Sequence, residues 1–351
     1  MTPRITLQDV ARVAKLHHST VSRALLGHAS LPGTTRTRVQ QIATRLGYVP
    51  DPMLASLASY RQNVRRSRSQ ATINWVFGGP DANWWSNITT YQKFYEGARQ
   101  RAQHLGFTVE PFWLRESGMS PKRASDILKA RNVTGILLAP QFGACAHLRL
   151  EWSSFAVVTI GNSLISPRLH AVAPNHFRAA KTIVSKLRSY GYCRIGLALM
   201  ASQDDRVDRA WSGGFLTEQL RHYPDSLIPP LLPADAPHPK IESAFFDWYE
   251  RYRPDAIISC GTLFSDFFSN QGFQIPRDAG FAYLNLSEES QEEAGIFENP
   301  LSVGAAAVDL LVGVLQRNEK GIPESPQRTL IEGEWKNGST LRYSHRAQSR
   351  T

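Results

Sequence analysis

The sequence predicts a small all-α amino-terminal headpiece of the helix-turn-helix type, followed by a longer α/β core. Over roughly the first fifty residues, apolar residues recur at intervals of three and four, which is the spacing of one helical face. From Thr72 onward, continuous apolar strands alternate with helical segments, a pattern typical of a parallel sheet covered on both faces. The length of 351 residues leaves room for two or three domains.

The first helix is predicted by an apolar face and by its start. Its apolar positions are Leu7, Val10, Ala11 and Ala14. Thr6 comes directly before this face and Asp9 follows three residues later, which is the pattern of a capping box. Such a pair satisfies amide groups that the first turn of a helix leaves free, so we expect the helix to begin after Thr6.

Two more helices follow at short intervals. After a break at residues 15–17, the apolar positions of the second helix are Val21, Ala24 and Leu25. Two short helices joined by a turn of about three or four residues have the dimensions of a helix-turn-helix. The apolar positions of the third helix are Val39, Ile42, Ala43 and Leu46. Gly47 is expected to end this helix in the left-handed conformation.

These residues belong to an ordered block that extends past the third helix. It consists of Thr6-Leu7, Asp9-Val10-Ala11, Ala14, Thr20-Val21-Ser22-Arg23, Thr35-Arg36, Val39, Leu46, Tyr48, Pro50 and Leu57-Ala58. The block resembles the DNA-binding headpiece of the LacI/GalR (lactose-repressor) family of transcription regulators. The helical spacing alone leaves open an ordinary three-helix bundle that does not bind DNA.

The resemblance implies which side chains contact DNA. It places His18, Ser19 and Arg23 at base-reading positions, and the hydroxyls of Thr20 and Ser22 near phosphates. Further DNA contacts are implied for Thr6, His17, Thr35, Arg36, Tyr48 and Leu57. An arginine in a base-reading position can pair bidentately with guanine, which discriminates against other bases by about 1–3 kcal/mol.

The start of the second helix departs from the family pattern at two positions. Lys15 stands where the family often has glycine in the turn, and His17 stands where a serine usually caps the helix. Histidine is a poorer N-cap, so we expect a slightly weaker helix start. Val21 is expected to face the interior. The neighbouring His17 and His18 do not predict a metal site, because adjacent side chains on a helix diverge and no other ligand is near.

Residues 51–60 are expected to form a hinge helix that begins at Asp51-Pro52, since proline is tolerated in a first helical turn. Small residues at 55, 56 and 58 would let two copies pack closely. The resemblance implies that Leu57 inserts into the minor groove. Apolar side chains inserted there between base steps kink the duplex. An ordinary apolar linker helix is the alternative. Residues 60–71 are basic and polar without periodicity, so they are expected to be a tether.

Positive charge is concentrated in this first fifth of the chain. Residues 1–71 contain eleven Lys and Arg against two Asp, a net charge of +9, whereas the whole chain carries +10. A localised positive field is what the neutralisation of phosphates requires, and it predicts binding that weakens steeply with salt.

The core is expected to contain two successive α/β units. Strands are expected at 73–77, 108–114, 135–139, 156–160, 194–199, 256–259 and 280–284, and helices at 92–105, 122–130, 176–190 and 215–222. By resemblance this is the periplasmic-binding-protein-like core, with two Rossmann-like lobes and three crossovers; the resemblance spans residues 5 to about 342. The expected domains are 1–50 (helix-turn-helix), 51–71 (hinge helix and basic linker) and 72–345 (effector-binding and dimerisation core). Lobe 1 is expected at about 72–170 and 290–325, and lobe 2 at about 171–289 and 326–345.

An effector site is expected in the cleft between the lobes, where loops converge at the carboxyl ends of the strands. The candidate residues are Asp81, Asn83, Trp84, Trp85, Arg209, Asn285 and Glu298. Carboxylates and amides can bind hydroxyls, and an indole face can stack on a sugar ring. Arg209 lies near the family's ligand-contacting arginine, with Trp211 as its rival for that place. The tryptophans as core residues and Arg209 as an ordinary ion pair remain alternatives. Two departures, Gly261-Thr262 and Pro174-Asn175, replace polar pairs of the family, so the identity of the effector is left open.

Several classes of protein are disfavoured. The chain lacks the apolar run of a membrane span and the apolar core of a signal peptide, which favours a cytoplasmic protein. Cys145, Cys193 and Cys260 are far apart, so we expect three reduced, buried thiols and neither a disulfide framework nor a metal site. The dinucleotide, P-loop and nucleophile-elbow motifs are absent, so no cofactor and no enzyme activity are expected.

The sequence therefore predicts a cytoplasmic, homodimeric, sequence-specific DNA-binding regulator. We expect a repressor that binds a pseudo-palindromic double-stranded operator, because the two-fold symmetry of a dimer imposes that symmetry on its site. A small-molecule effector, a sugar on the family's example, would control it. A solute-binding protein or an enzyme on the same α/β core is the alternative.

Overall fold

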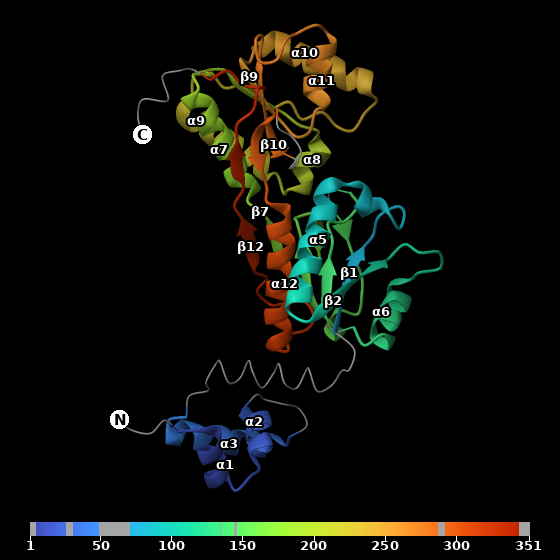
Figure 1. Cartoon of the computed structure of the whole chain (residues 1–351), viewed down its shortest axis with the longest axis vertical. Helices are drawn as coiled ribbons and strands as arrows, with labels where there is room; N and C mark the ends of the chain where they lie inside the picture. The colour runs from blue at the N-terminus through green and yellow to red at the C-terminus, as the bar shows by residue number, and fades with distance from the viewer. Residues whose placement is uncertain are drawn as a thin grey trace. The chain divides into compact units, whose positions relative to one another are not determined.

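The computed structural model describes residues 5–25, 31–48, 71–133, 135–143, 146–286 and 292–343. The chain divides into two compact units, Met1–Ser69 and Gln70–Thr351, which are described separately (Figure 1). The expected hinge helix, with its Leu57, and the tether up to residue 70 lie outside the described residues.

The first unit contains the three predicted helices, α1 (Leu7–Ala14), α2 (His18–Leu25) and α3 (Gly33–Leu46). The predicted capping box is confirmed: the amide of Asp9 donates to Oγ1 of Thr6, and the amide of Thr6 donates to Oδ2 of Asp9 at 2.9 Å. Gly47 ends α3 with a φ of 69°, in the left-handed region as predicted.

One small core holds these three helices together. Its buried members are Val10, Ala11, Ala14, Val21, Ala24, Val39 and Ala43. Val21 is fully buried, which confirms the prediction that it faces inward. Nη2 of Arg38 on α3 donates to the carbonyl oxygen of Ala14 at 2.6 Å. This arginine therefore satisfies a carbonyl group that the end of α1 leaves free.

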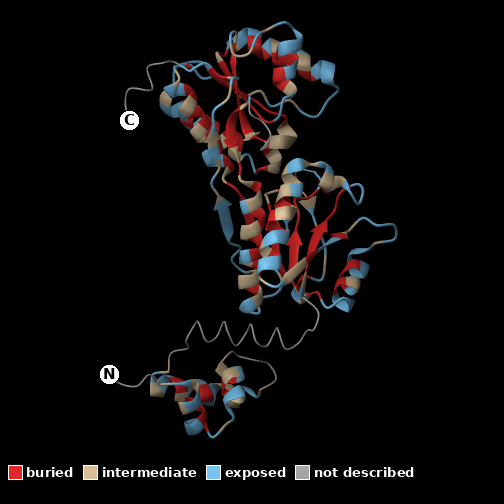
Figure 2. Ribbon diagram, in the orientation of Figure 1, coloured by how far each residue is buried: buried red, intermediate tan, exposed pale blue. Residues whose placement is uncertain are grey.

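The second unit begins with a six-stranded, all-parallel sheet in the order β12-β7-β5-β3-β1-β2. Its strands are β1 (Ala71–Phe77), β2 (Phe107–Trp113), β3 (Gly135–Leu138), β5 (Ala156–Ile160), β7 (His170–Pro174) and β12 (Arg328–Ile331). Residues 73, 75 and 77 of β1 pack under α5 (Thr89–His104) and α12 (Pro300–Gln316), whereas residue 76 packs under α6 (Pro121–Ala130). Both faces are covered, as the continuous apolar strands predict (Figure 2).

A second sheet has the order β13-β11-β10-β9-β8. Its strands are β8 (Ile195–Ala198), β9 (Ala256–Ser259), β10 (Gly280–Leu286), β11 (Ala294–Phe297) and β13 (Glu334–Lys336), and only β13 is antiparallel. One face packs on α7 (His176–Ser189) and α9 (Ala210–His222), the other on α10 (His238–Tyr252) and α11 (Leu263–Asn270). The short helix α8 (Ala201–Arg206) follows β8. Minor elements are η1 (Trp84–Asn87), η2 (Trp152–Ser154) and the two-stranded pair β4 (Ala146–His147) and β6 (Leu164–Ser166).

The described chain passes between the two sheets three times: after β7, after β11 and after β12. The fold is therefore a two-lobed α/β core with three crossovers. The sheets put the crossovers near residues 175, 298 and 332, five to nine residues later than the boundaries expected from sequence. The three strands after which the chain changes sheet, β7, β11 and β12, are not among the strands expected from sequence.

Helices α5 and α12 approach each other closely through glycine (Figure 1). A Cβ atom on Gly304 would lie 2.0 Å from the carbonyl oxygen of Phe94, and one on Gly97 would lie 2.0 Å from that of Leu301. No side chain fits at either position, so glycine is required for this contact. Among the described residues, no helix combines the length and apolar character that a membrane span requires.

Candidate functional site

Helix α2 presents a polar face to solvent. His18, Ser19 and Arg23 are exposed, while Val21 and Ala24 on the opposite side are buried in the headpiece core. This division follows from the helical period, because the two buried residues are three apart and pack against α1 and α3. The three predicted base-reading side chains thus share one accessible surface. The hydroxyl-bearing Thr20 and Ser22 are half-buried.

His17 stands at the cap position of α2, since its carbonyl oxygen accepts the amides of Thr20 and Val21 at 2.9 and 3.1 Å. Its Nδ1 lies 2.8 Å from Oγ of Ser19 and 3.4 Å from the amide nitrogen of the same residue. The second distance is long for a hydrogen bond. The imidazole therefore caps the helix weakly, in agreement with the expectation from sequence.

Lys15 connects α1 to α2 with a φ of 53°, in the left-handed region that the family's glycine adopts without strain. Its backbone amide nevertheless closes α1 on the carbonyl oxygens of Ala11 and Arg12. Lys15 therefore adopts the backbone conformation that the turn requires, but its side chain makes this conformation strained.

The other predicted DNA-contacting residues are spread over the headpiece. Thr6 is exposed, but its hydroxyl donates to Oδ2 of Asp9 at 2.6 Å. This bond and the backbone bond lower the pKa of the Asp9 carboxyl. Thr35 and Arg36 are half-buried in the first turn of α3, and Tyr48 packs partly against the headpiece core.

In the core, loops from both lobes enclose a cavity of about 180 Å³. From lobe 1 it is lined by Ile88, Thr90, Tyr91, Phe94, Pro140, Gly161, Asn162, Ser163 and Pro174, and from the crossovers and lobe 2 by His176, Gln203, Arg206, Val207, Trp211, Cys260, Asn285 and Glu298. Several of these residues follow the carboxyl ends of strands, where ligands bind in α/β sheets. Of the residues predicted from sequence, Asn285 and Glu298 line this cavity.

The loop after β1 lies outside the cavity lining. Oδ1 of Asp81 accepts the amide of Asn83 at 2.8 Å, and both residues are exposed. Trp84 is half-buried with its ring edge-on to Tyr91, which itself lines the cavity. Trp85 is buried among the aromatic rings of the lobe 1 core.

Arg209 also lies outside the cavity lining. Its Nε lies 2.8 Å from Oδ1 of Asp205, and its side chain is 76% exposed. Trp211 lines the cavity in its place, and Arg206 supplies a guanidinium from α8. Sequence reasoning missed Arg206; the signal that could have found it is its position just beyond the carboxyl end of β8.

Glu298 and His176 form a buried pair in the cavity wall. A carboxylate only accepts hydrogen bonds, so Nδ1 of His176 donates to Oε1 of Glu298, at 2.9 Å. Both side chains are 8% exposed. The ring of Trp211 packs edge-on to His176 with a centroid distance of 5.1 Å. The pair therefore forms a buried, hydrogen-bonded part of the cavity wall.

The cysteines show no reactive chemistry at this site. Burial raises the pKa of Cys260 to about 12, and its Sγ donates to Oδ1 of Asn285 at 3.2 Å. A neutral thiol is not a nucleophile. The expectation of three buried thiols is wrong for Cys193, which is exposed in the turn between α7 and β8; Cys145 lies outside the described residues. Among those described, no cluster of residues could hold a metal ion.

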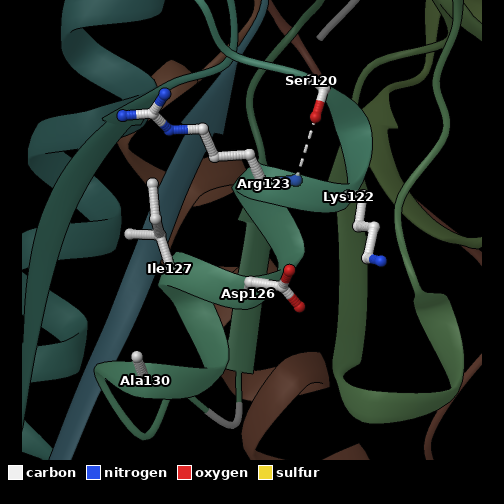
Figure 3. A pocket seen from close by; sticks show the side chains of 6 residues that line it. All are labelled: Ser120, Lys122, Arg123, Asp126, Ile127 and Ala130. Atoms are coloured by element: carbon white, nitrogen blue, oxygen red, sulfur yellow. Dashed lines mark hydrogen bonds between the residues drawn. The ribbon is translucent and has the colours of Figure 1, made fainter.

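A larger hollow of about 410 Å³ lies on α6, lined by Ser120, Lys122, Arg123, Asp126, Ile127 and Ala130. All six residues belong to this one helix and its cap. Figure 3 shows Lys122 and Arg123 extending in different directions, so they do not converge on one point. A ligand site needs convergent polar groups in a concave surface, and the interlobe cavity has them.

Comparison with known proteins supports both units. A family profile described as "Bacterial regulatory proteins, lacI family" matches residues 6–51. The HTH-type transcriptional repressor CytR of Escherichia coli (strain K12) is 38% identical over 192 residues, which cover 54% of this chain and 52% of that protein. The HTH-type transcriptional regulator TreR of the same strain is 23% identical over 163 residues, or 45% of this chain and 46% of that protein. The chain thus spans about half the length of these curated relatives.

Solved structures show the same fold. A transcriptional regulator CelR–cellobiose complex matches with a TM-score of 0.56 and 18% identity, over 96% of this chain and 100% of that chain. The Lac repressor dimer bound to operator and the anti-inducer ONPF matches with a TM-score of 0.56 and 17% identity, over 97% and 100%. Identities this low carry the fold and nothing more.

Proposed function

We propose that the chain is a member of the LacI family of bacterial regulatory proteins, whose profile matches residues 6–51, and that it is a sequence-specific DNA-binding transcription repressor. It binds a pseudo-palindromic operator as a homodimer, under the control of a small-molecule effector. It acts in the cytoplasm and is not an enzyme.

The observation that carries this proposal is the accessible polar face of α2. His18, Ser19 and Arg23 project from one side of a helix whose other side is held in the headpiece core. A recognition helix needs this arrangement, because base edges in the major groove are read by side chains near the start of the second helix. Arg23 has the fork of donors that pairs with guanine.

The distribution of charge supports the same proposal. Residues 1–71 carry a net charge of +9, and the remaining 280 residues only +1. Arg38 is committed to the carbonyl of Ala14, so part of this charge is structural. Among the described residues of the headpiece, Arg12, Lys15, Arg23, Arg36 and Arg45 remain against the single acid Asp9, an excess of positive charge suited to phosphates.

The core supplies the regulatory part of the proposal. Its cavity lies between two lobes joined by three crossover segments, a geometry in which a hinge can change the cavity shape. An effector shifts such an equilibrium only when it binds the two conformations with different affinity. We propose an effector of the sugar class, because Asn285 and Glu298 in the cavity wall are side chains that can bind hydroxyl groups.

Selection of bound duplexes from a random pool tests this function. We expect an enriched two-fold symmetric site, bound at least a thousandfold more tightly than shuffled duplex at the same salt concentration, the low end of specific recognition. Equal, salt-sensitive affinity for every duplex would contradict the proposal. The alternatives, a solute-binding protein or an enzyme on the same core, predict that no sequence is enriched.

A further inference from the structure

Arg206 reaches from one lobe of the core to the other. It ends α8 in lobe 2, and its Nη1 donates to the carbonyl oxygens of Gln141 and Gly143 at 3.1 and 2.7 Å. Its Nη2 donates to the hydroxyl of Tyr91 on α5. These three acceptors belong to lobe 1, so the guanidinium spans the cleft and also lines the cavity.

The positive charge of Arg206 has no negative partner in the described part of the chain. Its three acceptors are neutral, and it forms no ion pair with a described carboxylate. By contrast, Arg209 pairs with Asp205 at 2.8 Å. A half-buried cation without a counter-ion is costly. Carboxylates and phosphates match the planar fork of a guanidinium and form its strongest hydrogen bonds.

Glu298, the acid of the same cavity, forms no ion pair with Arg206. Oε1 of Glu298 accepts from His176 at 2.9 Å, in a pair that is 8% exposed on each side. The wall of the cavity also contains an unused donor. The indole N–H of Trp211 is buried without a hydrogen-bond partner among the described residues, and Trp211 is 4% exposed.

We propose that the ligand of this cleft carries an oxyanion, a carboxylate or a phosphate, and that Arg206 is the residue that recognises it. The inference rests on the proposed function, in which the cleft holds the effector. The cavity has a volume of about 180 Å³, and single-ring sugars are the probes chosen for it.

Ligand binding to the full chain tests this assignment. The probes are glucose, glucuronate, glucose 6-phosphate and inorganic phosphate, and the readouts are calorimetry and the fluorescence of the tryptophans. We expect at least one charged sugar to bind tenfold or more tightly than glucose. Glucuronate and glucose 6-phosphate distinguish a carboxylate from a phosphate. Arg206→Gln should bind charged and neutral sugars alike, and Arg206→Lys should retain part of the preference, because it keeps the charge without the fork.

Two other arginines serve as comparisons. Arg317→Gln removes an exposed guanidinium paired with Glu319 at 2.6 and 2.9 Å, and should leave the preference unchanged. Arg209→Gln should also retain it. Circular dichroism shows whether each variant is folded. If Arg206→Gln does not fold, the preference of Arg206→Lys for charged sugars tests the role of Arg206.

Three outcomes would overturn the proposal: equal binding of glucose and both charged sugars, a preference that survives in Arg206→Gln or is lost only in Arg209→Gln, or no binding of any of the four probes. Operator selection is measured separately on the wild-type chain. If the protein selects an operator but shows no preference for anions, only the proposal about Arg206 is contradicted. If it prefers anions but selects no DNA, only the proposed function is contradicted.

Discussion

His176 and Glu298 join two of the three crossovers, with Nδ1 of the histidine 2.9 Å from Oε1 of the glutamate. His176 directly follows the first crossover and Glu298 lies in the second. The third crossover is tied to both, because Nδ2 of Asn175 donates to Oε1 of Glu332 at 2.9 Å and Nδ2 of Asn299 donates to its carbonyl oxygen at 3.1 Å. The segments that a hinge motion must bend are thus bonded to one another beside the cavity.

Glu298→Ala should lower the free energy of unfolding by about 1–3 kcal/mol, because it leaves a buried imidazole N–H without an acceptor. Glu298→Gln keeps an acceptor oxygen and should cost less. Urea denaturation measures both. Glu319→Gln, in an exposed pair with Arg317, is the control and should change stability by no more than about 1 kcal/mol. Equal stability of Glu298→Ala and wild type would mean that the pair does not hold the crossovers.

Arg23→Ala should relax sequence preference at one position of each half-site, by about 1–3 kcal/mol, if Arg23 pairs with a base. Arg12→Ala, on the exposed surface of α1 beside Asp9, should weaken binding to every sequence equally. Competition gel shifts with single-base operator variants measure the difference. If the sequence preference of Arg23→Ala were unchanged, Arg23 would not contact a base.

The headpiece was predictable because its signals are local. The capping pair Thr6 and Asp9, the inward Val21 and the terminal Gly47 all act within a few residues of their positions in sequence. The seven expected core strands form for a similar reason, since continuous apolar runs must be buried on both faces. The short strand β7, whose edge pairs with the distant β12, carries no such local signal.

The cleft was less predictable because its wall depends on side-chain direction. Trp84 and Trp85 follow a strand, as ligand-binding residues often do. The ring of Trp84, however, is half-buried beside Tyr91, and Trp85 is buried in the core. Arg206 and Arg209 are three residues apart, but the left-handed backbone at Arg209, with a φ of 56°, turns the second arginine toward Asp205. A sequence pattern does not reveal such a local turn.

Lys15→Gly should stabilise the headpiece by about 1 kcal/mol, because glycine adopts the left-handed region without the Cβ clash of lysine. Gly47→Ala should have the opposite effect, since its φ is 69° although the space around it is open. Hydrogen exchange of the Val10 and Val21 amides in the full chain reports both changes. Slower exchange in Gly47→Ala would show that backbone strain does not limit this unit.

Cys260 should make the stability of the core depend on pH in the alkaline range. Burial raises its pKa from an ordinary value of 9.0 to about 12, so the folded state favours the neutral thiol. Its contribution is fully present below pH 9.0 and is lost as the pH rises toward about 12. Cys260→Ala should reduce this alkaline loss in urea titrations. Mass spectrometry at pH 8 should find Cys193 alkylated much faster than Cys260, and equal rates would contradict the burial of Cys260.

Gly304→Ala should destabilise lobe 1, because the added Cβ would lie 2.0 Å from the carbonyl oxygen of Phe94. Two backbones must separate to admit it, and overpacking of this kind costs about 1–3 kcal/mol or more. Gly313→Ala on the same helix is the matched control. There the nearest atom is the flexible Nη1 of Arg317 at 3.2 Å. The gain in helix propensity should therefore make Gly313→Ala neutral or up to about 1 kcal/mol more stable.

Urea denaturation of these two variants separates packing from propensity, since both make the same chemical change in α12. If the two had equal stability, α5 and α12 would not be in the close contact described. A destabilised Gly304→Ala beside a stable Gly313→Ala would show that the contact sets how the last long helix of lobe 1 closes over its sheet. That helix begins two residues after Glu298. A shift of α12 should therefore also change ligand affinity in the cleft, which the same calorimetric titrations with charged sugars would detect.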